Sequence, residues 1–209
     1  MAIHEAAVTL TDLLLAAENA VLALLLQAEA RQRSLLQKAF SAFFIALALA
    51  AAAGAVYHGW IFRGLILDRF VWRLTLFAIV AASAMAWIAA GHLLHSRWAH
   101  LAGLLTLLVG LAIVVSNLRG WANTFGVAIA FYLPAAMALL VAFAKVRAWA
   151  GFAGLVLTFV ASEVQQSALV LGPLDHNALY HIIEGLALLL IFFSARRLVR
   201  LQPTSAINQ

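Results

Sequence analysis

Seven long apolar segments run through this sequence, separated by short stretches of polar and charged residues. They cover residues 7–27, 35–57, 70–90, 101–115, 122–144, 149–170 and 177–194. A helix that crosses a membrane needs roughly 20 mainly apolar residues. With 66% hydrophobic and only 10% charged residues, the chain could not form the charged surface of a water-soluble domain. We therefore expect an all-α polytopic membrane protein in which residues 1–209 form one seven-helix bundle.

The composition also excludes several classes of protein. Cysteine is absent, which excludes disulfides, iron–sulfur clusters and cysteine nucleophiles and leaves nitrogen and oxygen as the metal ligands. The net charge of +5 falls in short connections and forms no basic stripe, so we expect no nucleic-acid partner.

The Lys and Arg residues divide unevenly between the two ends of such a bundle, nine against four. The larger group is Arg31, Arg33, Lys38, Arg97, Lys145, Arg147, Arg196, Arg197 and Arg200, and the smaller is Arg63, Arg69, Arg73 and Arg119. Because cytoplasmic loops carry the excess of basic residues, we expect the N-terminus outside and the C-terminus in the cytoplasm. The first residues lack the features of a signal peptide, which fits the inner membrane of a bacterium.

Ionisable side chains within or beside the apolar segments are the best indication of function, since they are costly in lipid and usually face a bundle interior or a cavity. At the end expected to lie outside they are His58, Asp68, Glu163, Asp175, His176, His181 and Glu184. His181 and Glu184 are three residues apart, so one helix face can direct both into the same cavity.

Zinc is the ligand that these residues favour, because neutral imidazole suits it and an open position can produce hydroxide near neutral pH. The candidate ligands are His58, His176 and His181. Asp68 could orient or deprotonate the bound water, and Glu163 or Glu184 could fix the tautomer of a ligating histidine. The sequence thus predicts a zinc site near the outer membrane face.

A resemblance to a known family rests on the same residues. His58 closes the second segment, Asp68 follows ten residues later, and residues 175–181 (Asp-His-Asn-Ala-Leu-Tyr-His) open the seventh. Here the sequence resembles the superfamily of alkaline ceramidases, adiponectin and progestin receptors and related seven-helix membrane hydrolases. The resemblance implies zinc ligands at His58, His176 and His181, with Asp68 activating water. It implies a hydrolase that acts on an amide or ester bond of a membrane lipid.

Two positions depart from the superfamily pattern. Its seventh-helix histidines are four residues apart, whereas His176 and His181 are five apart, which separates them by about 140° on an ideal helix. Asn177 occupies the position four before His181 and is a candidate for the substrate cavity. His176 could then be a ligand only from the turn that precedes the helix. The family serine four residues before His58 is Gly54.

Two other functions of helical membrane proteins leave different signatures. A rhodopsin needs a lysine in the seventh helix to bind retinal, and residues 177–194 contain none. His92, His95 and His100 gather at the expected cytoplasmic end and could bind haem or a metal. Histidines at a basic interface are the simpler interpretation of that group.

A transporter or receptor without catalysis is the alternative function. Glu18, Glu163 and Glu184 would then form a proton or substrate path, with Glu18 belonging to the cavity. Asp12 and Asn19 share the first segment with Glu18, and we interpret this group as a polar cluster that packs helices together. The zinc content of the purified protein would distinguish the two functions, since about one ion per chain favours the hydrolase.

Overall fold

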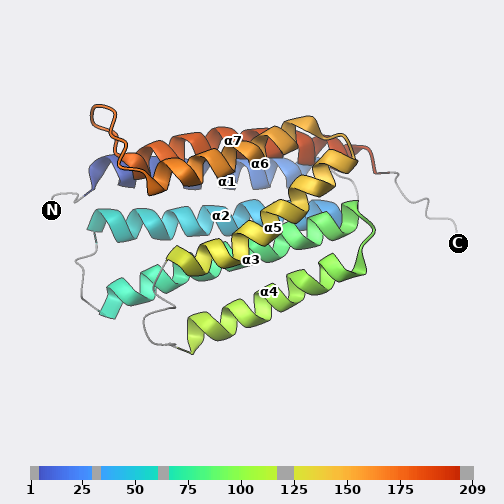
Figure 1. The fold of residues 1–209 in the computed structure, drawn as a ribbon, viewed down its shortest axis with the longest axis horizontal. Coiled ribbons are helices and arrows are strands. Elements are labelled where there is room, and N and C mark those ends of the chain that lie inside the picture. Colours follow the sequence, from blue (N-terminus) through green and yellow to red (C-terminus); the bar gives the residue numbers. More distant parts are fainter. Residues whose placement is uncertain (1–4, 30–33, 61–65, 117–124, 203–209) are drawn as a thin grey trace, which may run out of the picture.

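The computed structural model describes residues 5–29, 34–60, 66–116 and 125–202, and within these ranges helices are joined by turns and loops, with no strand. The helices are α1 (Ala6–Ala28), α2 (Leu35–Trp60), α3 (Ile66–Leu93), α4 (Arg97–Val115), α5 (Phe125–Lys145), α6 (Trp149–Gln166) and α7 (His176–Arg200). The prediction of an all-α chain with seven helices is confirmed (Figure 1).

Six of these described helices are long and apolar enough to cross a membrane, all except α6. With 18 residues α6 is the shortest of the seven, and its last turn carries Glu163, Gln165 and Gln166. These side chains lower the hydropathy of a helix that is already shorter than the roughly 20 apolar residues that a membrane span needs. The apolar spans that the sequence predicts are thus present in six helices.

The connection between α6 and α7 is longer than predicted, because α6 ends at Gln166 and not near residue 170. Gly172 adopts a positive φ of 59°, a conformation that favours glycine, and Pro173 cannot continue a helix from there. Asp175 then caps α7 by accepting a hydrogen bond of 2.9 Å from the backbone N–H of Ala178. His176 is consequently the first residue of α7 and does not lie in the preceding turn.

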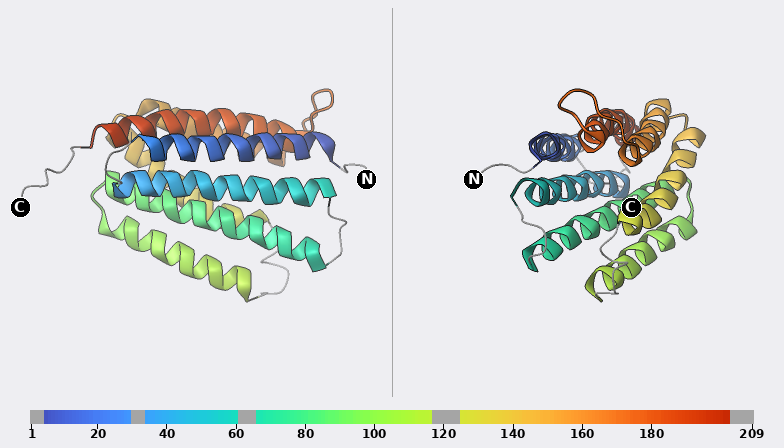
Figure 2. Two further views of the ribbon diagram at one scale, coloured as in Figure 1. Left: turned by 180° about the vertical axis from the view of Figure 1, so that it is seen from behind. Right: turned by 60° about the vertical axis from the view of Figure 1, so that its left-hand side comes forward.

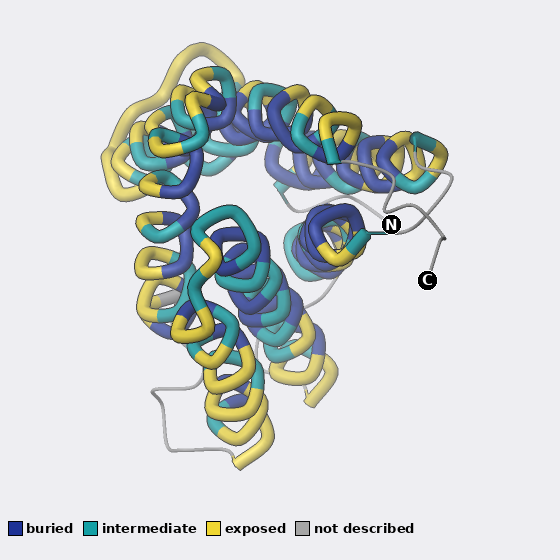
Figure 3. Tube along the Cα trace, turned by 90° about the vertical axis from the view of Figure 1, so that its right-hand side faces the viewer, coloured by how far each residue is buried: buried dark blue, intermediate teal, exposed yellow. Residues whose placement is uncertain are grey.

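Consecutive helices run in alternating directions along the bundle, and α1 begins at the end opposite the one where α7 finishes (Figure 1). α2 packs between α1 and α3, and α7 packs between α1 and α6 (Figure 2). α4 contacts mainly α3, while α5, with Pro134 inside it, crosses obliquely and joins α3 to α6. α4 is therefore the most peripheral helix, and much of its surface is exposed (Figure 3).

The tightest core lies in the half of the bundle where α2 begins and α5 ends. Phe40, Phe43, Phe44 and Phe143 are fully buried there, and the rings of Phe40 and Phe143 stack with centroids 6.1 Å apart. A Cβ atom at Gly154 would lie only 2.6 Å from the carbonyl oxygen of Ala187, so α6 and α7 also make close backbone contact. The other half of the bundle contains a cavity instead.

Candidate functional site

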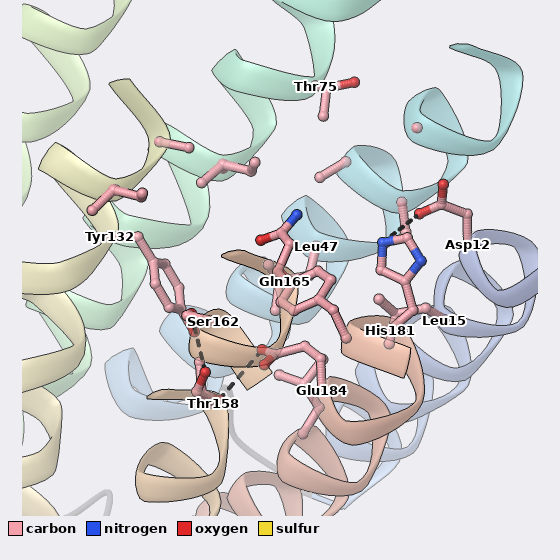
Figure 4. A pocket seen from close by; sticks show the side chains of 18 of the residues that line it. Asp12, Leu15, Leu47, Thr75, Tyr132, Thr158, Ser162, Gln165, His181 and Glu184 are labelled. Carbon is pink, nitrogen blue, oxygen red and sulfur yellow. Dashed lines mark hydrogen bonds and ion pairs between the residues drawn. The ribbon is translucent and has the colours of Figure 1, made fainter. Parts of the chain in front are cut away.

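A cavity of about 160 Å³ lies between six of the seven helices, in the half of the bundle that contains the beginnings of α1 and α7 and the end of α2 (Figure 4). Only α4 contributes none of its described residues. The polar side chains that line it are Asp12, His58, Thr75, Tyr132, Thr158, Ser162, Gln165, Tyr180, His181 and Glu184. Leu, Ile and Ala residues complete the walls. The site is thus a mainly apolar pocket with polar groups converging from several helices, as ligand sites usually are.

His181, on the second turn of α7, contacts α1 through both ring nitrogens. Its Nδ1 lies 3.1 Å from Thr11 Oγ1, and its Nε2 lies 3.2 Å from Asp12 Oδ1. In a neutral imidazole, Nε2–H can donate to the carboxylate, and Nδ1 then competes for the Thr11 hydroxyl hydrogen with the carbonyl oxygens of Ala7 and Val8, which lie 3.0 and 2.9 Å from the hydroxyl oxygen. The side chain is 11% exposed, so these two contacts hold a nearly buried ring in one orientation.

Asp12 owes its position to Gly54 on α2. A Cβ atom at residue 54 would lie 3.1 Å from each carboxylate oxygen of Asp12, so only a residue without a side chain leaves the carboxylate ordinary room. Asp12 is buried, and its Oδ2 has no hydrogen-bond partner among the described residues. Gly54 is the position where the resemblance leads us to expect a serine. In this chain an aspartate from α1 lies over that position.

Glu184 follows His181 by one helical turn and also faces the cavity (Figure 4). Thr158 on α6 donates a hydrogen bond of 3.4 Å to Glu184 Oε1. Oε2 is buried and has no partner within the described part of the chain. Glu18 approaches the same turn of α7 from α1, since a Cβ at Gly185 would lie 2.8 Å from Glu18 Oε2. Glu18 does not line the cavity itself.

His58 lies near the end of α2 and lines the cavity with a side chain that is 20% exposed. Its Nδ1 is 2.5 Å from Glu5 Oε2, at the residue that precedes α1. The structure therefore brings two of the three predicted zinc ligands, His58 and His181, to one cavity. Asp12, from α1, lines the same cavity.

The other predicted site residues lie outside the cavity lining. His176 and Asn177 open α7 and are half-buried, whereas Glu163 on the last turn of α6 is exposed. Asp68, the predicted catalytic base, is half-buried in the first turn of α3. None of these four side chains belongs to the cavity lining, so their predicted roles stay predictions.

The predicted zinc set is not assembled in the described residues, where no three His, Cys, Asp or Glu side chains are arranged to hold a metal ion. Both nitrogens of His181 already have protein partners, and His176 is absent from the lining. The donor types that the cavity does offer, two imidazoles and the Asp12 carboxylate, are compatible with zinc. Zinc binding remains a prediction.

The histidines at the opposite end of the bundle make ordinary hydrogen bonds. Gln202 Nε2 donates to His92 Nε2 over 2.7 Å, and His100 Nδ1 lies 2.9 Å from the carbonyl oxygen of Ser96. Glu29, at the end of α1, accepts from Arg196 Nε at 2.6 Å and also from Arg200. Hydrogen bonds from Arg200 and Arg196 hold the pKa of Glu29 below its ordinary value.

Sequence reasoning missed part of this cavity. Asp12 was expected to pack helices, and Tyr132, Thr158 and Tyr180 gave no signal because single hydroxyls in apolar segments are common. One clue was available for Asp12, since an acidic residue within an apolar segment is costly unless it faces a cavity. The missing side chain at Gly54 was a second clue, because it leaves space beside His58.

The fold and the cavity define a seven-helix protein with an internal polar site. The chain belongs to a family of unknown function, DUF6962, whose model matches residues 7–200. The match covers nearly all of the helical bundle, from α1 to the end of α7. No curated protein and no solved structure matches the chain.

Proposed function

We propose that the bundle lies in a membrane and binds an amphipathic molecule in its cavity, as a receptor or transporter would. One observation carries the proposal: Asp12, His181 and Glu184 reach a single cavity from α1 and α7 although apolar side chains surround them. Ionisable groups inside a membrane bundle are expensive and usually mark a ligand or ion site. A role in helix packing alone would not require unpartnered carboxylate oxygens beside a cavity.

The size of the cavity supports a ligand that is only partly enclosed. Pockets that surround a drug-sized molecule measure roughly 300–1,000 Å³, whereas this cavity has about 160 Å³. Ile129 lines the cavity and is 37% exposed, so we place the opening of the cavity beside it, at α5. The polar group of a membrane lipid would fit inside, and its chain would leave beside Ile129.

The proposed orientation puts the N-terminus outside and the cavity in the outer half of the membrane. It is supported by the basic residues of the described ranges, which are concentrated where α7 ends: Lys38, Arg97, Lys145, Arg147, Arg196, Arg197 and Arg200, against Arg69 and Arg73 at the other end. A reporter fused after Gln209 should be cytoplasmic, by the positive-inside rule. Exposure of that reporter outside the cell would contradict the orientation. We propose the inner membrane of a bacterium as the location.

Native mass spectrometry of the detergent-solubilised protein tests whether the cavity binds a lipid. The wild type should retain a lipid adduct, and Ile129→Trp should lose most of it because the larger side chain narrows the cavity at its edge. Val141→Trp is the matched control, since Val141 lies on the same helix, is 46% exposed and is not part of the lining. Equal adducts on both variants would contradict the proposed site.

A zinc-dependent lipid hydrolase is the second candidate. It is favoured by the position of His58 and His181, two histidines that match zinc ligands of the ceramidase-like superfamily and line one cavity. No three His, Cys, Asp or Glu side chains of the described residues are arranged to hold a metal ion, so a rearrangement would have to bring His176 or Asp12 to the two histidines as the third ligand. When bound, zinc would supply a strong nucleophile from water near neutral pH. The apolar walls would receive the lipid chain.

Metal analysis of the purified protein tests whether it is a zinc-dependent hydrolase. About one zinc per chain is expected for a hydrolase, with most of it lost in His181→Ala. His92→Ala is the control, because His92 lies at the other end of the bundle. Metal-free wild-type protein from zinc-supplemented cells would exclude the hydrolase and leave the binding proposal intact.

A further inference from the structure

The charges around the cavity restrict the ligand that it can bind. Asp12 and Glu184 line it, and no Lys or Arg does so within the described ranges. The ion-pair partner that the described residues offer either carboxylate is the imidazole of His181, which carries no permanent charge and reaches Asp12 Oδ1 only. The cavity therefore lacks a permanent positive charge to balance two acidic side chains.

Four buried polar atoms of lining residues have no protein partner within the described ranges: two are carboxylate oxygens, and the others are Tyr132 OH and Gln165 Oε1. Asp12 is 3% exposed and Glu184 is 5% exposed, and neither Asp12 Oδ2 nor Glu184 Oε2 has a hydrogen-bond partner among the described residues. A buried, unsatisfied carboxylate oxygen costs free energy that a suitable donor would recover. The missing partner is therefore a hydrogen-bond donor, and a positively charged donor would gain most.

Aromatic rings provide a second, independent feature that suits a cation. Trp72, Tyr132 and Tyr180 line the same cavity from α3, α5 and α7. The faces of such rings attract ammonium groups, and the attraction is strongest where water is excluded. Sites that recognise organic ammonium ions combine aromatic rings with acidic side chains in this way.

We infer that the ligand is a cationic amphiphile, an apolar chain with a protonated amino group that meets Asp12 and Glu184. This inference rests on the proposed function, since it specifies the ligand of the same cavity. The surface at the cavity end also carries acidic side chains, among them Glu5, Glu163 and Asp175, and these attract cations in general. A preference for the amine that is lost in variants of Asp12 or Glu184, and kept when a surface carboxylate is removed, would therefore report on the cavity.

Binding of three ten-carbon probes that differ only in the head group tests the inference. Decylamine, decanol and decanoate are titrated at pH 7 into the full-length protein in a neutral maltoside detergent, and tryptophan fluorescence and the melting temperature are recorded. Decylamine should bind at least about tenfold more tightly than decanol, as expected for a charge-assisted hydrogen bond. Asp12→Asn and Glu184→Gln should each weaken the amine by about tenfold and leave decanol nearly unchanged.

Glu163→Gln is the control for charge alone, because it removes the same charge from an exposed position outside the lining. It should bind decylamine like the wild type. If decanol or decanoate binds as tightly as the amine and Ile129→Trp abolishes that binding, the cationic ligand is wrong and the cavity proposal stands. If Ile129→Trp leaves the binding of all three probes unchanged, the proposed function itself fails. The relative affinities of the wild type for the three probes test the preference for a cation even if a variant does not fold.

Discussion

α1 and α7 lie side by side along the bundle, and polar side chains join them at two places that differ in chemistry (Figure 2). Near the end of both helices, Glu29 meets the guanidinium groups of Arg196 and Arg200. Near their beginning, Asp12 meets only the imidazole of His181. The same pair of helices therefore carries one carboxylate with two cationic partners and one without any permanent cation.

The environments of the two contacts also differ. The Glu29 side chain is 13% exposed and its partner Arg200 is 54% exposed, so this network is partly open to solvent and adds modest stability. Asp12 is 3% exposed and keeps an unpartnered oxygen within the described ranges, an arrangement that reduces stability. The first contact thus joins the helix ends, whereas the second lowers stability, as expected if the proposed ligand meets Asp12.

The largest expected effect comes from filling the space that Gly54 leaves for Asp12. In Gly54→Leu the new side chain would displace the Asp12 carboxylate and occupy part of the cavity, because even a Cβ would lie 3.1 Å from both of its oxygens. Overpacking of this kind costs about 1–3 kcal/mol. The variant should melt at a lower temperature and lose ligand binding, measured with the ten-carbon probes.

Ala52→Leu is the control for that substitution, since residue 52 lies on the exposed face of the same helix. It should keep both the melting temperature and the binding of the wild type. Retained binding in Gly54→Leu would mean that the ligand does not enter beside Asp12, and the contrast between the two α1–α7 contacts would lose its functional meaning.

The helices could be predicted from the sequence because each apolar segment is long, and breaks such as Gly172-Pro173 are chemically clear. The end of α6 was placed too late, since Ala168, Leu169 and Val170 are apolar although they follow the helix. Hydropathy does not distinguish an apolar turn from an apolar helix. The observed boundary follows from the extended backbone at Ser167.

The cavity was only partly predictable. His58 and His181 stand out because histidine is rare in apolar segments, and the alternating direction of the helices places both at one end. The contact between Asp12 and His181 depends on the rotation of α1 about its axis, which apolar residues around the whole helix do not specify. Gly54 leaves space for the side chain of Asp12, and the sequence of α2 alone does not indicate which residue of another helix fills that space.

A smaller effect is expected at the hydroxyl that holds His181. Thr11→Val keeps the shape of the side chain and leaves His181 Nδ1 without its partner at 3.1 Å. The net contribution of one such hydrogen bond is about 0.5–1.5 kcal/mol, so this variant should melt slightly below the wild type and bind decylamine more weakly.

Thr9→Val provides the comparison on the same helix. Thr9 is 2% exposed, and its hydroxyl oxygen has no hydrogen-bond partner in the described part of the chain. Removal of an unsatisfied hydroxyl should be neutral or slightly stabilising. If both variants lower the melting temperature equally, the contact of Thr11 with His181 contributes nothing specific to the site.

The smallest expected effect is at the solvated contact, where Glu29→Gln should matter only while the carboxylate is ionised. Arg200 and Arg196 lower the pKa of Glu29 from its ordinary value of 4.5, so the folded protein binds its proton less readily than the unfolded chain. The resulting stabilisation is fully present above pH 4.5 and is lost as the pH falls through the lower folded-state value. Wild type should therefore melt slightly above Glu29→Gln at pH 7, and the difference should vanish in acid.

The difference in melting temperature should also shrink in about 1 M salt, which screens exposed charges. In a background that already carries Arg196→Gln and Arg200→Gln, Glu29→Gln should have no further effect at any pH. A difference that persists in acid, or that survives removal of both arginines, would mean that Glu29 stabilises the fold by packing, and the chemical contrast with Asp12 would be wrong at this end.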